Sequence, residues 1–161
     1  DDDVVRFLKI FTFKSREEIE ALAVEVAERP HQRAAQKALA ASVTELVHGT
    51  DQLQRVLAAT DALWGGGDIR DLDEATLVAA TADLPRASLT IGESTVVDAL
   101  VALGFEKGKT AARRTISSGG ASINNLKVED PEAVLREEDV LAGGLALIRK
   151  GRKNLAVLEL S

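Results

Sequence analysis

The segment STVVDALVALGFEKGKTAARRTISSGGASINNLKV, residues 94–128, carries the signals that define the C-terminal fold. A Ser-Thr pair followed by Asp98 is typical of a helix cap, and the apolar residues behind it predict a short helix that ends at Gly104. A second short helix is predicted to start near Thr110 and to stop at a Gly-Gly pair. Two short helices followed by turn residues indicate a small domain of mixed structure.

The rest of the C-terminal part has the character of strands. Four stretches have the length and composition of strands in two hairpins: 121–124, 127–128, 145–150 and 155–160. The first pair flanks an Asn-Asn turn. The second pair is interpreted as two strands of alternating apolar and polar residues that form a hairpin around Gly151. The predicted fold class is α+β, in which two short helices pack on one side of a small antiparallel sheet over residues 91–161.

Residues 1–66 are predicted to form an all-α helical domain. Ser15 followed by Glu18 is a capping box at the start of one helix. Pro30 can occupy the first position of the next helix, where its missing N–H costs nothing, and Gly49 is a natural left-handed end for it. These signals divide the N-terminal part into successive helices with short connections.

The chain is thus expected to have three parts. Residues 67–90 contain one weak helix signal and a Leu-Pro break, so they are interpreted as a linker between the helical domain and the C-terminal domain. Some packing of this linker on either neighbour remains open. The sequence contains no Met and begins at Asp1, so we expect it to be a piece of a longer translated protein.

The composition excludes several classes of chemistry. The chain has 161 residues and no Cys, so disulfides, thiolate metal sites and a Cys nucleophile are ruled out. Two His are too few for a multi-His metal centre, and no Ser, His and Asp set has a spacing typical of nucleophilic catalysis. No catalytic residue and no metal ligand is therefore assigned. No apolar run approaches the roughly 20 residues of a membrane span and no signal segment opens the chain, which predicts a soluble cytoplasmic protein.

The formal net charge of −6 is unevenly distributed along the chain. Residues 1–90 hold 10 basic and 16 acidic side chains (10 − 16 = −6), whereas residues 91–161 hold 10 of each (10 − 10 = 0). The cations of the second part are concentrated in two clusters: Lys107, Lys109, Arg113 and Arg114, and then Arg149, Lys150, Arg152 and Lys153. An acidic chain can therefore present a local basic surface.

The first cluster fits a surface that binds a nucleic-acid backbone. Lys109 and Arg113 lie four residues apart, which places them on one face of a helix, and Thr110 is near the N-terminal amides. Phosphates are bound by such fixed donors and by cations that release counterions. The alternative is a solvated basic face, but a hairpin turn can bring the second cluster to the same surface. A nucleotide-binding P-loop is disfavoured, because Gly104 stands one residue too close to the Gly-Lys-Thr run.

Two stretches resemble known families. Residues 94–128 resemble the small αL RNA-binding domain of ribosomal protein S-four type at the following positions: Asp98, Leu100, Gly104, Lys107, Lys109, Thr110, Ala112, Arg113, Arg114, Ile116, Gly119, Gly120, Ile123 and Asn124. Residues 3–66 resemble the helical region that follows the catalytic fold of bacterial tyrosyl-tRNA synthetases, through DVVRFLKIFTF, SREEIEAL, RAAQKALAASVTELVHG and ALWGG. The closing RKGRKNLAVLEL is similar to the terminal hairpin of that family.

The resemblance implies a parent enzyme of class I that activates tyrosine with ATP and magnesium and transfers it to tRNA-Tyr. Such enzymes are usually homodimers of the cytoplasm, and neither DNA nor a membrane is an expected partner. Their HIGH-like and KMSKS-like signature motifs do not occur in this sequence. We therefore expect this chain alone to be inactive and to hold no cofactor.

The resemblance also implies where RNA is contacted. The helical domain of the family faces the anticodon side of the tRNA, and the αL domain grips the stem and the long variable arm. The positions that match the RNA-facing loop and helix start of the family are Lys107, Lys109, Thr110, Arg113 and Arg114. The second cluster completes the expected RNA-binding set with Arg149, Lys150, Arg152 and Lys153.

Two positions depart from the family pattern, and other functions stay open. Lys14 stands where an apolar residue is usual, which removes the hydrophobic staple onto Ile19. Asn125 is followed by Leu rather than by the common Gly, which leaves the turn type undecided. The alternative function is a stand-alone RNA-binding or ribosome-associated module with no synthetase parent. A further option is that the helical part is only an interaction scaffold.

Overall fold

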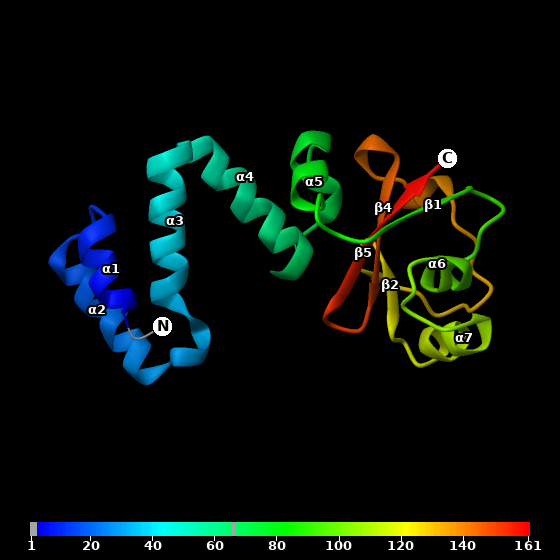
Figure 1. Cartoon of the computed structure of the whole chain (residues 1–161), viewed down its shortest axis with the longest axis horizontal. Helices are drawn as coiled ribbons and strands as arrows, with labels where there is room; N and C mark the ends of the chain where they lie inside the picture. Colours follow the sequence, from blue (N-terminus) through cyan, green and yellow to red (C-terminus); the bar gives the residue numbers. More distant parts are fainter. Residues whose placement is uncertain (1–2, 66) are drawn as a thin grey trace. The chain divides into compact units, whose positions relative to one another are not determined.

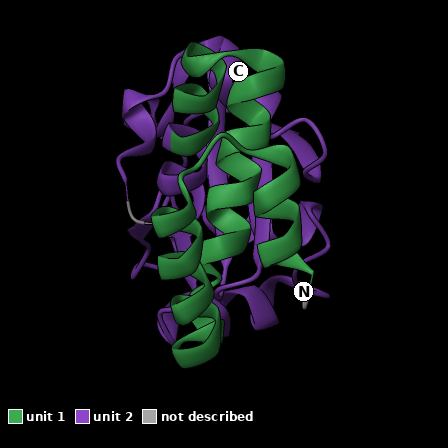
Figure 2. Cartoon of the chain, turned by 90° about the vertical axis from the view of Figure 1, so that its left-hand side faces the viewer, with its two compact units in different colours: residues 1–57 green, residues 58–161 purple. Residues whose placement is uncertain are grey.

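The computed structural model describes residues 3–65 and 67–161 of the chain (Figure 1). These residues fall into two compact units, residues 1–57 and residues 58–161, which Figure 2 shows in different colours. Each unit has its own buried apolar side chains. None of the described helices is both long enough and apolar enough to cross a membrane.

The first unit is helical, as predicted. Its elements are α1 (Val4–Phe11), α2 (Arg16–Glu28), η1 (Pro30–Gln32), α3 (Ala34–His48) and the beginning of α4 (Thr50–Thr60). The predicted capping box is confirmed: the Glu18 amide donates to Ser15 Oγ at 3.2 Å, and the Ser15 amide donates to Glu18 Oε2 at 2.7 Å. Gly49 ends α3 with a φ of +85°, as expected for a left-handed end.

The prediction for Pro30 is correct only in part. Pro30 does occupy a first helical position, but the helix is the short 3₁₀ turn η1. Arg33 then adopts a left-handed conformation, with a φ of +54°, and α3 begins at the following residue. The left-handed residue separates the two helices, so the proline does not lead directly into α3.

The core of the first unit is small. Its fully buried members are Val4, Leu8, Ile19 and Ala35. Lys14 occupies the position of the missing staple, and its Nζ lies 3.6 Å from Glu18 Oε1. Phe13 beside it is 93% exposed. The chain entry to α2 is therefore held by polar contacts rather than by an apolar pair.

The second unit is built on a five-stranded sheet. Its helical elements are the end of α4, η2 (Asp61–Gly65), η3 (Ile69–Asp71), α5 (Glu74–Ala80), α6 (Val96–Ala102), α7 (Lys109–Ser117), η4 (Glu137–Asp139) and η5 (Ala142–Gly144). Its strands are β1 (Arg86–Leu89), β2 (Ala121–Ile123), β3 (Leu126–Lys127), β4 (Leu145–Lys150) and β5 (Asn154–Leu160). The strand order is β1-β5-β4-β2-β3. The two predicted short helices and both predicted hairpins are confirmed, and the fold class is α+β.

The sheet differs from the prediction because both of its faces are covered. Helices α6 and α7 lie on one face and α5 lies on the other (Figure 1). The residues of β4 and β5 that face α6 and α7 are Ala146, Ile148, Ala156 and Leu158. Those on the other face are Leu145, Leu147, Leu155 and Val157. The sequence interpretation of alternating strands was wrong: four successive apolar residues in each strand require cover on both sides.

The segment expected to be a linker contributes this second cover. Leu72 and Leu77 are buried against the sheet, and Ile69 is 1% exposed. Strand β1 pairs with β5 in parallel, in the register Arg86↔Val157, so the sheet is mixed rather than wholly antiparallel. The sequence prediction missed this strand because its Arg-Ala-Ser-Leu run is short and polar, and because a parallel partner lies far along the chain.

Candidate nucleic-acid interface

Helix α7 presents the first basic cluster to the surface. Its inner side carries Ala112 and Ile116, both fully buried against α6 and the sheet. Spacing on the helix then directs Arg113 and Arg114 outward. Gly108 precedes the helix without a side-chain cap, and its carbonyl accepts from the Ala111 amide. The amides of Lys109 and Thr110 and the positive end of the helix dipole therefore stay available on this side.

Two cations of this cluster are already paired with acids. Lys109 Nζ lies 2.8 Å from Asp98 Oδ1, and Arg113 Nε lies 2.9 Å from Glu132 Oε1. The hydrogen bond from Lys109, together with those from Thr95, lowers the pKa of Asp98 from 3.8 to about 2. Hydrogen bonding to Glu132 raises the pKa of Arg113. Both cations are exposed, so a phosphate would compete with a carboxylate for each of them.

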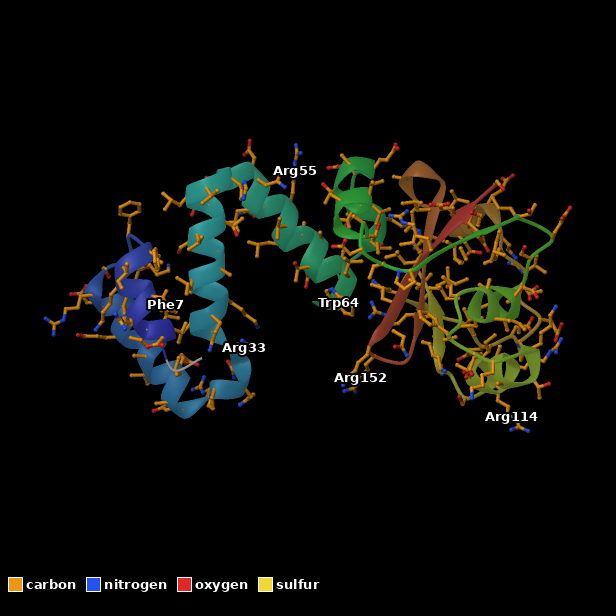
Figure 3. All side chains as sticks on the ribbon, viewed as in Figure 1. Phe7, Arg33, Arg55, Trp64, Arg114 and Arg152 are labelled. Carbon is orange, nitrogen blue, oxygen red and sulfur yellow. The ribbon has the colours of Figure 1, made fainter. Side chains whose placement is uncertain are left out.

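Four other cations are exposed. They are Lys107 before α7, Arg114 on α7, and Arg152 and Lys153 in the turn between β4 and β5. In the described part of the chain, no acid lies within ion-pair distance of any of the four. Figure 3 shows Arg114 and Arg152 projecting toward the same, lower side of the second unit from these two elements. Their charge is therefore available to an anionic ligand.

Lys150 connects the two clusters. Its Nζ donates to the Phe105 carbonyl at 2.6 Å and lies 2.8 Å from Glu106 Oε1, in the loop before α7. Glu106 also accepts a hydrogen bond from the Thr115 hydroxyl on α7. The hydrogen bond from Lys150 lowers the pKa of Glu106 most, and the bond from Thr115 lowers it further. The start of the β4–β5 turn is thus held beside the α6–α7 loop. Lys150 itself is engaged within the protein.

Arg149 does not lie on this surface. Its guanidinium donates to the Leu63 carbonyl and lies 5.0 Å from the centre of the Trp64 ring, on the α5 side of the sheet. Burial lowers the pKa of Arg149. Neighbouring residues of a strand point to opposite faces, so Arg149 and Lys150 cannot share one surface. The expectation that the whole second cluster turns toward α7 is therefore wrong for Arg149.

The contacts of Trp64 and of the Asn-Asn turn could not be predicted from the sequence, which indicated only turn geometry for the two Asn residues. Asn124 and Asn125 both have positive φ, +48° and +66°, which confirms them as turn residues of the hairpin type. Asn124 is buried and its amide side chain bonds to the Asp139 carbonyl and the Leu147 amide.

The described residues include no group of three or more His, Cys, Asp or Glu side chains that could hold a metal ion.

Two family models of known proteins match this chain. The family model for class I tRNA synthetases (W and Y) matches residues 1–65. The model described as the tyrosine–tRNA ligase SYY-like C-terminal domain matches residues 76–158. The chain therefore belongs to the tyrosine–tRNA ligase family and contains its C-terminal domain.

Curated relatives agree over the length of this chain. It is 49% identical over 161 residues to the tyrosine–tRNA ligase of Streptomyces avermitilis, an alignment that covers 100% of this chain and 38% of that protein. The tyrosine–tRNA ligase of Nocardia farcinica is 47% identical over 161 residues, with 97% of this chain and 38% of that protein covered. That of Thermobifida fusca is 46% identical over 158 residues, with 96% and 37% covered. The chain thus spans well under half the length of these relatives.

Proposed function

We propose that this chain is the tRNA-binding C-terminal part of a tyrosine–tRNA ligase. The contact surface comprises the α6–α7 loop, the start of α7 and the β4–β5 turn. The observation that carries the proposal is a set of exposed cations with no acidic partner among the described residues, on elements joined by Lys150: Lys107, Arg114, Arg152 and Lys153.

The charge arrangement supports an RNA backbone as ligand. The exposed cations supply electrostatic attraction and counterion release, and the Lys109 and Thr110 amides at the start of α7 supply directional donors. Lys109, Thr110 and Arg113 border this surface, and the two basic residues exchange Asp98 and Glu132 for phosphate on binding. The first unit is assigned the anticodon side of the same tRNA.

The chemistry of the parent enzyme belongs to its part outside this chain. We propose that this part activates tyrosine with ATP and magnesium and that the enzyme acts as a homodimer in the cytoplasm. The present chain contributes tRNA binding, with neither DNA nor a membrane as partner. No residue described above is assigned to the chemical step.

The parent enzyme provides the direct test. Arg114→Ala combined with Lys107→Ala is expected to raise the KM for tRNA by tenfold or more, at roughly 1 kcal/mol for each lost charge-assisted contact. Tyrosine-dependent exchange of pyrophosphate into ATP, which needs no tRNA, is expected to stay unchanged.

The matched control is Arg86→Ala. Arg86 is on the edge strand β1 in register with Val157, three residues (~10 Å at ~3.4 Å per strand residue) along β5 from its first residue, and its guanidinium pairs with Glu159. An unchanged KM for tRNA in the double variant, or an equal rise in the control, would reject the proposed surface.

A further inference from the structure

Helix α4 leads from the first unit into the second, and the backbone carbonyls at its C-terminal end accept hydrogen bonds from side chains of the sheet. After Thr60, α4 continues into the π-helical turn η2. The last carbonyls of a helix have no partner within it. Two of them are bonded here by side chains from the sheet: Asn125 Nδ2 donates to the Ala62 carbonyl at 2.7 Å, and Arg149 donates to the Leu63 carbonyl.

The contacts around these two bonds form a compact arrangement. Ala62 and Leu63 are 2% and 5% exposed and belong to the apolar core on the α5 side of the sheet. The Arg149 guanidinium lies over Trp64 and has Asn125 Oδ1 at 3.5 Å. A cation near the carbonyl end of a helix is also favoured by the helix dipole. Arg149 therefore makes a hydrogen bond, a cation–π contact and a dipole interaction at one helix end.

We propose that Asn125 and Arg149 form a clamp that fixes the end of the α4–η2 helix on the sheet, and that Arg149 is a positioning residue for tRNA binding rather than an RNA contact. The positioning role rests on the proposed function. Because α4 begins in the first unit and ends in the second, the clamp sets how firmly the covalent connection between them is attached to the RNA-binding domain.

Firm attachment has a direct consequence for a ligand that both units contact. When two binding modules are joined by a loose connection, ordering that connection costs conformational entropy on binding. A fixed helix end removes part of this entropy cost. Once one unit has bound the tRNA, it also raises the effective concentration of the other unit near its own contact site. Loss of the clamp is therefore expected to weaken tRNA binding without removing any cation from the RNA-facing surface.

Two substitutions separate the clamp from an electrostatic contact. Arg149→Lys keeps the positive charge but removes the planar guanidinium that stacks and donates in fixed directions. Asn125→Gly keeps the positive φ of the turn, which glycine favours, and removes the amide side chain that donates to the Ala62 carbonyl and accepts from Arg149. Arg152→Ala is the control, because it removes an exposed cation of the same hairpin that makes none of the clamp contacts.

The clamp itself is read from Trp64, which is the single Trp of the chain. Trp64 is 55% exposed and has the Arg149 guanidinium over its ring, so in Arg149→Lys and in Asn125→Gly its fluorescence emission is expected to be quenched more strongly by acrylamide. Amide hydrogen exchange in η2 is expected to be about fivefold faster, while exchange in α6 and α7 is unchanged. Arg152→Ala should leave both signals as they are. Unchanged quenching and exchange in the two clamp variants would overturn the clamp.

Binding to tRNA then tests the positioning role. Both clamp variants are expected to bind about fivefold more weakly with an unchanged salt dependence, because neither substitution alters charge. Full affinity for tRNA in Asn125→Gly or in Arg149→Lys would overturn the positioning role. If instead Arg152→Ala binds like the unmodified chain and binding does not depend on salt, the proposed function fails and the positioning role with it. The fluorescence and hydrogen-exchange measurements need no tRNA, so they test the clamp whether or not the proposed function holds.

Discussion

At the scale of single residues, the basic surface contains both cations that are exposed and cations that form ion pairs with carboxylates. Arg114 and Arg152 are exposed, whereas Lys109 and Arg113 are each bound to a carboxylate. The sequence predicted the clusters but could not separate these classes, because the acids that pair with them come from elsewhere in the fold. Glu132 lies 19 residues from its partner Arg113.

Glu132→Gln is expected to increase affinity for tRNA. The substitution releases Arg113 from its ion pair and removes a negative charge beside the surface, and exposed pairs of this kind contribute about 0.2–1 kcal/mol, or up to about fivefold in affinity. Equilibrium filter binding at fixed salt measures the change. Glu129→Gln is the control, because Glu129 pairs with Lys127 outside the proposed surface and should give a smaller increase. Weaker binding by Glu132→Gln would contradict the role of Arg113.

At the scale of elements, the sequence predicted helix ends better than it predicted sheet faces. A capping box involves residues only three positions apart, so the one formed by Ser15 and Glu18 could be predicted directly from the sequence. The cover of β4 and β5 on both faces depends on segments far along the chain. The position of Arg149 could have been inferred from strand alternation, because a residue next to Lys150 must face the opposite side.

The cap of α6 gives the chain a dependence on acid pH. Asp98 accepts hydrogen bonds from the Thr95 amide and hydroxyl, at 3.0 and 2.7 Å, and pairs with Lys109. The folded pKa of about 2 lies below the ordinary 3.8, so this stabilisation is fully present above about pH 4 and is lost as pH falls toward 2. Urea unfolding between pH 2 and pH 7 is expected to show a smaller fall in unfolding free energy for Asp98→Asn. An identical pH profile would contradict the assignment.

The hydroxyl side of the same cap can be tested at neutral pH. Thr95→Ala removes the hydroxyl that accepts from the Asp98 amide at 3.2 Å, which is expected to lower the free energy of unfolding by about 1 kcal/mol. Urea titration measures this, with Thr90→Ala as the comparison, because the exposed Thr90 hydroxyl makes no cap contact. The cap assignment would be contradicted if the two variants lost equal stability.

At the scale of the whole molecule, the second unit begins well before the C-terminal domain that the sequence suggested. The segment between the two predicted domains supplies α5 and β1, and the preceding η2 supplies further apolar cover. A weak helix signal and a Pro break looked like a linker because their partners on the sheet are distant in sequence. The helical first unit was predictable because its capping and apolar spacing are local signals.

Truncation tests this boundary. Residues 58–161 are expected to fold alone with the circular dichroism of an α+β protein and a cooperative urea transition. Residues 91–161 lack β1, α5 and the α4 end, so Leu145, Leu147, Leu155 and Val157 lose their cover, and this fragment is expected to be unfolded or aggregated. Cooperative unfolding of the shorter fragment would show that the second core is dispensable.

The salt dependence of tRNA binding tests the proposed surface most directly. The logarithm of the association constant is expected to fall linearly with the logarithm of salt concentration, and Arg114→Ala combined with Arg152→Ala should reduce the slope by about 1.4–1.8, at ~0.7–0.9 for each lost phosphate contact. Arg86→Ala should leave the slope unchanged. Identical affinity and slope in the unmodified chain and the double variant would show that tRNA does not bind at the surface formed by α7 and the β4–β5 turn.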